Sequence, residues 1–239
     1  MPCYNEGKRL ALAPFVALTE EAPISVLFVD DGSTDDTHAI LERVCDSTHG
    51  RLQLLPLPKN LGKAEAVRSG LRVAVAGGAD VVGYLDADGA TPPRAMLDLL
   101  AALAAHGIEV VLGSRVKRLG AHIQRHELRH YLGRVFATGA ALALDLPVYD
   151  TQCGAKLFRV TPSLTAALER PFTSKWVFDV ELLQRLHRGQ DGVAGVSAER
   201  FVEVPLSVWT DVAGSKVRPW DAARAAFDLL RIGLEGRRR

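Results

Sequence analysis

The sequence of 239 residues has few cysteines and almost no excess of charge of either sign. Its three cysteines, Cys3, Cys45 and Cys153, are too few and too scattered for a zinc site, and an odd number fits no closed disulfide framework. We therefore expect reduced thiols in a cytoplasmic protein. The 29 basic and 28 acidic residues leave a net charge of +1, which gives the chain as a whole no attraction to nucleic acid or membranes.

Long hydrophobic runs are lacking as well. No stretch approaches the roughly 20 apolar residues that a helix needs to cross a bilayer, and the N-terminus does not have the organisation of a signal peptide. We expect a soluble protein that binds the cytoplasmic face of a membrane peripherally at most. The sequence also contains no internal repeat, low-complexity tract or obvious linker, so we expect one domain over residues 1–239.

Two strand-like stretches end in acidic pairs. The apolar run Val81–Leu85 leads into Asp86-Ala87-Asp88, and residues 24–29 lead into Asp30-Asp31. Two carboxylates so close together suit one Mg²⁺ or Mn²⁺ ion that takes further ligands from phosphate oxygens. Taken alone, Asp86 and Asp88 are equally compatible with an acidic turn, because Asp and Gly are ordinary turn residues.

Strand-like and helical patterns alternate along the chain. The first half has strand patterns near residues 24–29, 52–57, 81–85 and 109–113, and helical patterns near residues 8–19, 39–44, 64–76 and 93–106. The second half has a short strand pattern near residue 157, a helix from about residue 176, a strand over residues 202–209 broken by Pro205, and an amphipathic helix over residues 220–234. This alternation predicts an α/β fold with a mostly parallel sheet covered by helices on both faces. Ligands bind at the carboxyl ends of such strands, where both acidic pairs lie.

Basic residues crowd the segment that follows residue 113. They are Arg115, Lys117, Arg118, Arg125, Arg129 and Arg134, with Glu127 as the only acid among them. Apolar residues between 128 and 136 recur at helical spacing beside these charges. Two interpretations remain open, namely a solvated charged face or an anion site beside a helix that lies on a membrane surface.

Four blocks of the sequence carry a resemblance to a known family. They are Pro2-Cys3-Tyr4-Asn5-Glu6, the acidic loop over residues 30–35, Asn60-Leu61-Gly62-Lys63, and the Asp86-Ala87-Asp88-Gly89-Ala90 block. In this order they resemble the inverting nucleotide-sugar glycosyltransferases of family 2, which have the GT-A fold. The resemblance covers nearly the whole chain and implies a nucleotide-binding half over residues 1–112 and an acceptor-binding half over residues 113–239.

Within that family the sequence is most similar to the dolichyl-phosphate β-glucosyltransferases, with the polyprenyl-phosphate mannose synthases as near relatives. Gly113-Ser114-Arg115 and residues 150–158, 176–183 and 214–216 carry this finer resemblance. It implies transfer of glucose from UDP-glucose to a polyprenyl phosphate. The alternatives are a mannosyl transferase that uses GDP-mannose, a transferase with a hydroxyl acceptor, and a nucleotide-sugar-binding module without turnover.

The resemblance also implies roles for individual residues on the donor side. It places the nucleotide sugar against Pro2, Tyr4, Glu6, Asp30, Asp31, Lys63, Asp86, Ala87 and Gln152. Asp30 and Asp31 would accept hydrogen bonds from the base or the ribose, since only an acceptor satisfies an N–H group of the base. Asp86 and Asp88 would hold Mg²⁺ or Mn²⁺ on the diphosphate, where the cation neutralises the growing charge of the leaving group.

On the acceptor side, the implied nucleophile is a lipid phosphate. A phosphate monoester is already ionised near neutral pH, so no general base is required. Arg115 and Arg129 would bind it, because guanidinium groups form paired contacts with phosphate oxygens. If the acceptor is a hydroxyl instead, Asp179 is the implied general base. Alternatively, Asp179 and Glu181 only complement the dipole of a helix that begins near residue 176.

The sequence departs from the family in two respects. Family members carry an apolar first strand before the block that begins at Pro2, and here Met1 stands where that strand should end. We therefore expect a sheet without its first strand, a misassigned start or a shortened chain. The eukaryotic glucosyltransferases also carry a membrane-spanning segment, so contact with a lipid acceptor would have to come from residues 119–136 or 220–234.

Overall fold

The computed structural model describes residues 1–48, 50–124, 127–211 and 219–237. Within these ranges, the side chains of residues 124, 127–132, 219–223, 226 and 235–237 lie outside the description, and Arg129 is one of them. The strands are β1 (Pro2–Cys3), β2 (Val26–Asp30), β3 (Leu52–Pro56), β4 (Val81–Leu85), β5 (Val110–Ser114), β6 (His122–Gln124), β7 (Ala155–Arg159), β8 (Phe201–Pro205) and β9 (Val208–Thr210). The helices are α1 (Ala13–Glu21), α2 (Thr37–Asp46), α3 (Lys63–Ala76), α4 (Ala95–Leu103), α5 (Glu127–Leu144), α6 (Pro162–Glu169), α7 (Phe178–Arg188) and α8 (Pro219–Arg237), with a short 3₁₀ turn at Ala198–Arg200.

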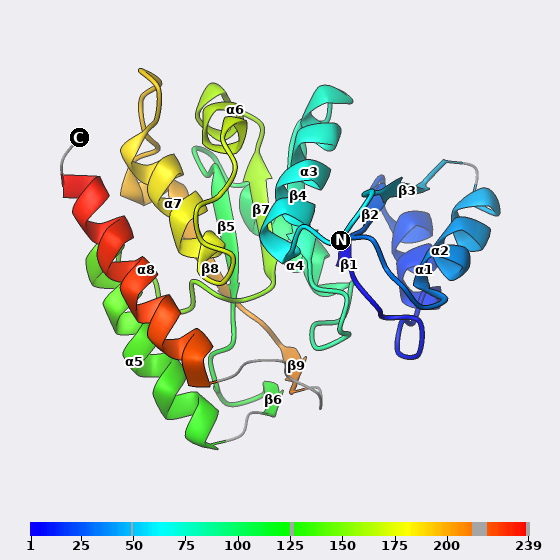
Figure 1. Cartoon of the computed structure of the whole chain (residues 1–239), viewed down its shortest axis with the longest axis horizontal. Coiled ribbons are helices and arrows are strands. Elements are labelled where there is room, and N and C mark those ends of the chain that lie inside the picture. Colours follow the sequence, from blue (N-terminus) through cyan, green and yellow to red (C-terminus); the bar gives the residue numbers. More distant parts are fainter. Residues whose placement is uncertain (49, 125–126, 212–218, 238–239) are drawn as a thin grey trace.

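The strands form a mostly parallel arrangement, as the alternating pattern predicts. A three-stranded parallel sheet has the order β1-β2-β3, and a four-stranded sheet has the order β4-β7-β5-β8. Strand β7 lies antiparallel to both of its neighbours, whereas β5 and β8 are parallel. Helix α3 packs against β1, β2 and β4, so it links the two sheets. Figure 1 shows β1–β3 with α1 and α2 on one side of the molecule and α5, α7 and α8 on the other.

The three-stranded sheet begins with the short β1, whose two residues belong to the first motif itself. Pro2 and Cys3 pair in parallel with Val29 and Asp30, and the amide of Asp31 donates to the carbonyl of Cys3 at 2.8 Å. The terminal amino group of Met1 donates to the carbonyl of Leu27 at 2.6 Å. Strand β1 therefore fixes the start of the first motif against the strand that carries Asp30 and Asp31.

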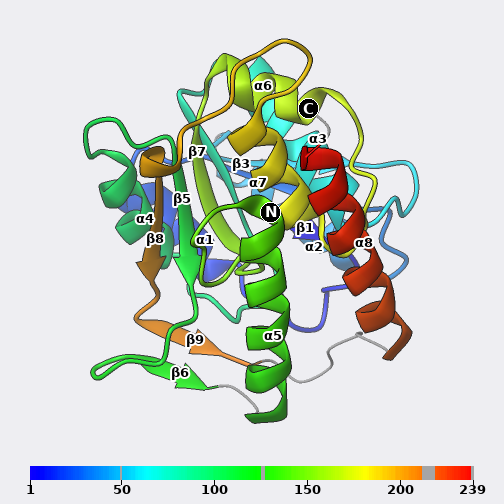
Figure 2. The same ribbon diagram turned by 90° about the vertical axis from the view of Figure 1, so that its left-hand side faces the viewer.

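Helices cover both faces of the four-stranded sheet. Alternate residues of β5 divide between two hydrophobic clusters, because successive side chains of a strand point to opposite faces. Val110 and Leu112 belong to a cluster that includes residues of α3, α5, α6, α7 and α8, whereas Val111 belongs to a cluster that includes residues of α1, α2 and α4. Of these last three helices, α4 packs against β5. Helices α5 and α8 lie side by side across one face of the sheet, as the turned view in Figure 2 shows. In the described part of the chain, no helix is both long and apolar enough to span a bilayer.

The structure differs from the sequence expectation in a few elements. Helix α1 begins at Ala13 rather than near residue 8, because Pro14 fits only the first turn of a helix. The strand expected over residues 202–209 divides after Pro205 into β8, which pairs with β5, and β9, which pairs with β6. The pattern did not predict β6 or α6.

All three cysteines are free thiols, and burial raises the pKa of Cys3 to about 12 and that of Cys153 to about 11.

Candidate active site

The centre of the site is the carboxylate of Asp86, directly after β4. Its backbone amide donates to the carbonyl of Gly154 at 2.9 Å, which ties the end of β4 to the loop before β7. Lys63, the first residue of α3, brings its ammonium to 2.7 Å from Oδ1 and 2.8 Å from Oδ2 of Asp86. Two motifs that lie 23 residues apart in the sequence therefore meet in one ion pair.

Gly154 is required for this arrangement. A Cβ atom at this position would lie 2.1 Å from Oδ2 of Asp86, far closer than any van der Waals contact. Glycine is therefore the residue that lets the loop before β7 approach the carboxylate. The finer family resemblance included Gly154 in the block over residues 150–158, but the sequence does not reveal that its partner is Asp86.

Asp88 lies beside Asp86 in the turn that follows β4. Its Oδ1 accepts a hydrogen bond from the amide of Ala90 at 3.0 Å. Burial raises the pKa of Asp88, and the neighbouring charge of Asp86 adds to this effect. Two adjacent carboxylates whose charges repel each other are stabilised by a shared cation.

The donor set fits a divalent cation that is also held by phosphate. Asp86 Oδ1 is buried and accepts no well-directed hydrogen bond, although it lies in the ion pair with Lys63. In the described ranges, no group of three or more His, Cys, Asp or Glu side chains is arranged around a common metal position. Magnesium is typically bound by one or two carboxylates together with substrate phosphates and water. Asp86 and Asp88 match that requirement.

The two N-terminal loops bind each other through backbone groups. The amide of Asn5 donates to Ser33 Oγ at 3.1 Å, and the amide of Thr34 donates to Asn5 Oδ1 at 2.8 Å. The amide of Glu6 donates to Thr37 Oγ1 at 2.8 Å. Asn5 has a φ of 53°, a conformation that asparagine tolerates better than most residues. The first block therefore has a defined position over the acidic loop.

Asp30 and Asp31 are almost completely buried and hold loops in place. Asp31 accepts from the amides of Leu61 and Gly62, each at 2.8 Å. Burial raises the pKa of Asp31, and these two hydrogen bonds oppose the rise. Asp30 accepts from the amide of Ser33 at 3.0 Å and lies 2.9 Å from the ring of His38. These contacts position the Asn60–Lys63 block, and a role of either acid in binding the nucleotide stays a prediction.

The other predicted donor residues lie around these loops. Pro2 and Tyr4 are half-buried in β1 and the loop that follows it, and Ala87 separates the two acids after β4. Glu6 is buried and forms a paired ion contact with Arg9, with Arg9 Nη2 2.7 Å from Glu6 Oε1. Gln152 donates from Nε2 to the carbonyl of Trp176 at 3.4 Å. Binding of a nucleotide sugar by these residues stays a prediction.

Arg115, predicted to bind the acceptor phosphate, is held in place by Asp150. Its Nε and Nη2 donate to Oδ2 and Oδ1 of Asp150, each at 2.7 Å, and its backbone amide donates to Oδ2 at 3.1 Å. Asp150 raises the pKa of Arg115 even though burial lowers it, and the charge of Asp86 acts in the same direction as Asp150. The Arg115 guanidinium also lies over the ring of Trp209 at 5.3 Å.

A second acid, Glu203, holds the loop that contains Asp150. Glu203 on β8 accepts from the amides of Tyr149 and Asp150 at 2.7 and 2.8 Å. Arg134 on α5 donates to the carbonyl of Tyr149 at 3.1 Å and lies 3.7 Å from the centre of its ring. Sequence reasoning did not assign Asp150 or Glu203 a function, because their partners are distant in the chain. The side chain of Arg129, the second predicted phosphate ligand, lies outside the described residues.

Asp179 is buried in a polar cluster beneath the site. Its Oδ1 accepts from the ammonium of Lys156 at 2.6 Å and from the hydroxyl of Tyr84. Lys156 is fully buried on β7 and also donates to the carbonyl of Cys153 at 2.6 Å. Burial and the charge of Asp179 raise the pKa of Tyr84 well above its usual value. Sequence reasoning assigned Lys156 no role, although the block over residues 150–158 that carries the finer family resemblance includes it.

Glu181, two residues after Asp179, contacts a different set of residues. It accepts from the amide and hydroxyl of Thr173, from the amide of Ser174 and from Arg185, whose Nη2 lies 2.6 Å from Oε1. Glu181 therefore fixes the loop before α7.

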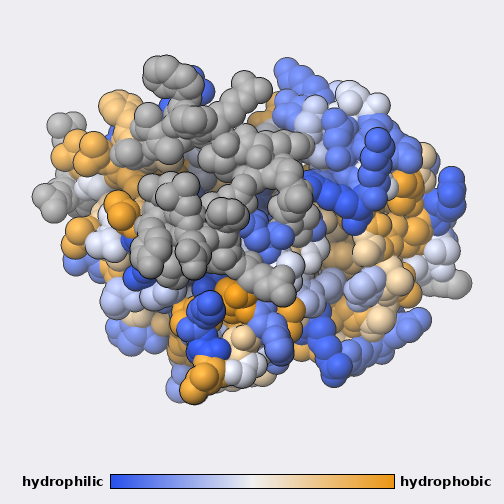
Figure 3. Space-filling view, turned by 90° about the horizontal axis from the view of Figure 1, so that it is seen from below, coloured by the Kyte–Doolittle hydropathy of each residue, from blue (hydrophilic) through white to orange (hydrophobic). Residues whose placement is uncertain are grey.

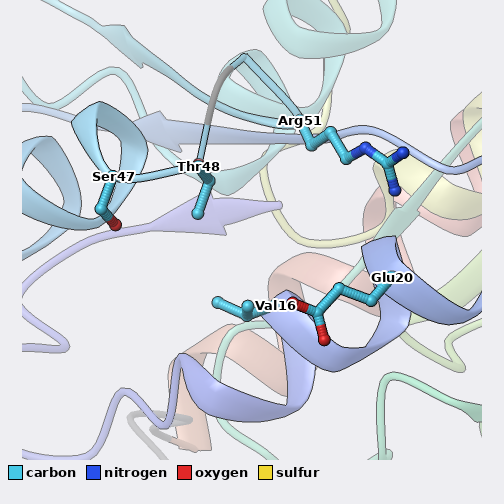
Figure 4. A pocket seen from close by; sticks show the side chains of 5 residues that line it. All are labelled: Val16, Glu20, Ser47, Thr48 and Arg51. Atoms are coloured by element: carbon cyan, nitrogen blue, oxygen red, sulfur yellow. The ribbon is translucent and has the colours of Figure 1, made fainter.

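The surface pocket in Figure 4 lies away from the candidate active site and contains none of the predicted site residues. It is lined by Val16, Glu20, Ser47, Thr48 and Arg51.

Comparisons with known proteins identify the family of the chain. Residues 1–163 match the model of the glycosyl transferase family 2. The chain belongs to this family. It is 32% identical to a dolichyl-phosphate beta-glucosyltransferase of Trichomonas vaginalis, with 98% of this chain and 69% of the relative covered. It is 26% identical to a polyprenol monophosphomannose synthase of Mycolicibacterium smegmatis, with 99% of this chain and 86% of that protein covered.

Solved structures share the fold at lower identity. A mannosyl-3-phosphoglycerate synthase from Rubrobacter xylanophilus superposes with a TM-score of 0.67 at 17% identity, over 98% of this chain and 71% of that one. A mannosyltransferase from Pyrobaculum calidifontis superposes with a TM-score of 0.56 at 20% identity, over 100% of this chain and 63% of that one. These likenesses confirm the expected α/β fold of glycosyltransferases. The chain is therefore a glycosyltransferase, as its sequence predicts.

We expect Gly154→Ala to lower the rate of sugar transfer by about 100-fold, because the added methyl group displaces the carboxylate of Asp86. The measurement is kcat/KM for transfer, with far-UV circular dichroism as a check on folding. Gly139→Ala is the matched control, because its Cβ would meet only Leu229 at an ordinary distance of 3.9 Å. Wild-type transfer by Gly154→Ala would contradict the close approach described here.

Proposed function

We propose that this glycosyltransferase moves glucose from UDP-glucose to a polyprenyl phosphate, with inversion at the sugar and with the help of a divalent cation. The proposal rests on one observation: an acidic pair and an oriented arginine both follow strands at one edge of the sheet. The adjacent acids Asp86 and Asp88 suit a cation on a diphosphate, and Arg115, oriented by Asp150, suits a second phosphate. The names of the relatives in Trichomonas vaginalis and Mycolicibacterium smegmatis favour a polyprenyl-phosphate acceptor.

On the donor side, Asp86 and Asp88 would hold Mg²⁺ or Mn²⁺. The bound cation would supply positive charge where negative charge develops on the departing nucleotide diphosphate. Lys63 adds a second positive charge at the same place. The Pyrobaculum calidifontis structure, which contains GDP-Man and Mn²⁺, is consistent with this role for a cation.

On the acceptor side, the phosphate would be bound by Arg115. The guanidinium keeps its orientation because two of its nitrogens are held by Asp150, and the rest of the group is available to an incoming anion. A guanidinium held in this way presents paired donors to phosphate without losing further side-chain entropy. An ionised phosphate oxygen then attacks the sugar directly, and no protein side chain has to remove a proton.

The structure also bears on Asp179, the candidate base for a hydroxyl acceptor. Its carboxylate is buried and already accepts hydrogen bonds from Lys156 and Tyr84. These contacts hold the carboxylate in place in the core. This favours a positioning role for Asp179 and therefore a phosphate acceptor. A mannosyl transfer from GDP-mannose is the second candidate, because the Mycolicibacterium smegmatis relative is named a mannose synthase.

The proposal is tested by a transfer assay with purified protein, radiolabelled UDP-glucose or GDP-mannose, and either polyprenyl phosphate or polyprenol in Mn²⁺. We expect labelled lipid from UDP-glucose and polyprenyl phosphate only, and its loss in EDTA. We expect Asp88→Ala to abolish transfer, because it removes one of the two carboxylates at the diphosphate. Transfer by Asp88→Ala at nearly the wild-type rate would show that the cation role is assigned wrongly.

Asp179→Asn distinguishes the two acceptor classes. We expect this variant to keep at least about a tenth of the wild-type kcat, since loss of a general base costs about 100-fold or more. We also expect its melting temperature to fall, because the buried ammonium of Lys156 loses its charged partner. A loss of several orders of magnitude in kcat by a folded Asp179→Asn protein would instead identify a base and a hydroxyl acceptor.

A polyprenyl acceptor requires contact with a lipid surface, which we assign to the outer side of α5 and α8. The apolar strip consists of Val135 and Leu142 on α5 and Phe227, Leu230 and Leu234 on α8, all more than half exposed. Figure 3 shows hydrophobic surface at the left-hand edge of the molecule, the edge at which α5 and α8 lie in Figure 1. The last three residues of the sequence are Arg237, Arg238 and Arg239, and basic residues in an amphipathic segment suit anionic lipids.

We expect the chain to sediment with vesicles of phosphatidylcholine and phosphatidylglycerol, and Leu230→Glu to reduce the bound fraction by about tenfold. Placing a charge where an apolar side chain meets lipid removes favourable burial and adds a desolvation cost. Val73→Glu is the control, because Val73 is an exposed apolar residue on α3, outside the apolar strip. Equal binding by the two variants would show that α8 does not contact the membrane.

A further inference from the structure

Charges alternate in sign along a line that runs from the surface of the site into the core. Asp86 contacts Lys63, Lys63 lies within electrostatic range of Asp179, and Asp179 contacts Lys156. The Lys63 ammonium also lies 5.8 Å from the ring centre of Phe178, the residue before Asp179. Lys63 therefore stands between two carboxylates, one at the cation site and one beneath it.

The Lys63 side chain is only partly enclosed by the protein. It is 43% exposed, whereas that of Asp179 is only 6% exposed and that of Lys156 is fully buried. A lysine side chain is flexible and its ammonium is a compact charge without a preferred plane. Both described hydrogen bonds to Asp179 end on Oδ1, so Oδ2 is left for a further donor. Lys63 can thus change partners without a change in the backbone.

We propose that Lys63 and the divalent cation compete for Asp86, and that Lys63 moves toward Asp179 and the donor diphosphate when the cation binds. This inference rests on the proposed function, because it assumes that Asp86 is a cation ligand. The ammonium lies 2.7 and 2.8 Å from the two oxygens of Asp86, where it neutralises the carboxylate that the cation requires. Release of Lys63 couples cation binding to the delivery of a positive charge to the nucleotide.

Lys156 is the positioning residue in this exchange. Its ammonium contacts Asp179 Oδ1 at 2.6 Å and holds that carboxylate in place. Because the charge of Asp179 is already paired with Lys156, we expect Asp179 to influence cation affinity mainly through Lys63 rather than by direct attraction.

The test measures Mn²⁺ binding by electron paramagnetic resonance of the free ion, with the full chain and without nucleotide. We expect Lys63→Met to bind Mn²⁺ about three- to tenfold more tightly than the wild type, because the competing charge is gone. Lys59→Met is the matched control, because Lys59 is exposed in the loop that precedes Lys63 and the substitution removes the same charge. We expect its affinity to stay within about twofold of wild type.

A second comparison tests the part played by Asp179. Asp179→Asn should weaken Mn²⁺ binding in the chain that has Lys63, and it should have little effect in the Lys63→Met chain. Far-UV circular dichroism shows whether each variant is folded. The proposal is overturned if Lys63→Met binds Mn²⁺ no better than the wild type, or if Lys59→Met gains as much.

Asp86→Asn separates failure of this inference from failure of the proposed function. If Asp86→Asn abolishes Mn²⁺ binding but Lys63→Met does not improve it, the cation site stands and the competition is wrong. If the wild type and Asp86→Asn bind Mn²⁺ equally, Asp86 is not a ligand and both are wrong.

Discussion

The contact between Lys156 and Asp179 is the interaction on which the arrangement of the site depends. An ammonium that is removed from water is destabilised by several kcal/mol unless charge and hydrogen bonds replace its hydration. Lys156 obtains these from Asp179 on α7 and from the carbonyl of Cys153 before β7, while Tyr84 on β4 completes the cluster. Three elements that border the site are thus fixed to one buried charge. Any displacement of α7 relative to the sheet would leave that charge unpaired.

The need to replace the hydration of a buried charge also explains the contacts of the other buried acids. Asp31, Asp150 and Glu203 each accept two or more hydrogen bonds that hold a loop or a guanidinium in position. Asp86 and Asp88 differ from them, because the side chain of Asp86 contacts the partly exposed Lys63 and that of Asp88 accepts from a single backbone amide. A carboxylate whose hydrogen-bonding capacity is not met by the fold is available to a ligand. This difference supports the proposed role of Asp86 and Asp88 as cation ligands, whereas Asp30 and Asp31 hold loops in position.

The sequence predicts those parts of the molecule that depend on local pattern. The strand Val81–Leu85 was predicted with its observed bounds, because an apolar run ends abruptly at Asp86 and turn residues follow. Helix α3 was predicted to within one residue, since Gly62 and Gly77 stand at its two ends. Strands β6 and β9 have three residues each and no usable periodicity, so they become evident only when they pair.

The contacts made by the site residues could not be predicted from the sequence, because their partners are distant in the chain. Asp31 was expected to face the nucleotide, but the sequence does not reveal that both its oxygens accept from backbone amides 30 and 31 residues away. Lys156 was not singled out because its position in a strand gives no sign of a partner on α7. Spacing identifies which residue types can do chemistry, whereas burial and pairing determine which of them remain available.

The two halves of the site have different mechanical support, and this difference has consequences for catalysis. Around Asp86 the loops are held through their backbone amides, which donate to the carbonyls of Cys3 and Gly154 and to side-chain oxygens of Asn5, Asp31 and Ser33. Around Arg115 the guanidinium itself is held by the side chain of Asp150, and the loop that contains Asp150 is held by Glu203 on β8. A direct displacement requires the nucleophile and the leaving group to lie in line across the sugar. In the proposed reaction, the loops around Asp86 would fix the position of the donor, and the ion pair of Arg115 with Asp150 would set how well the acceptor phosphate is aligned with it.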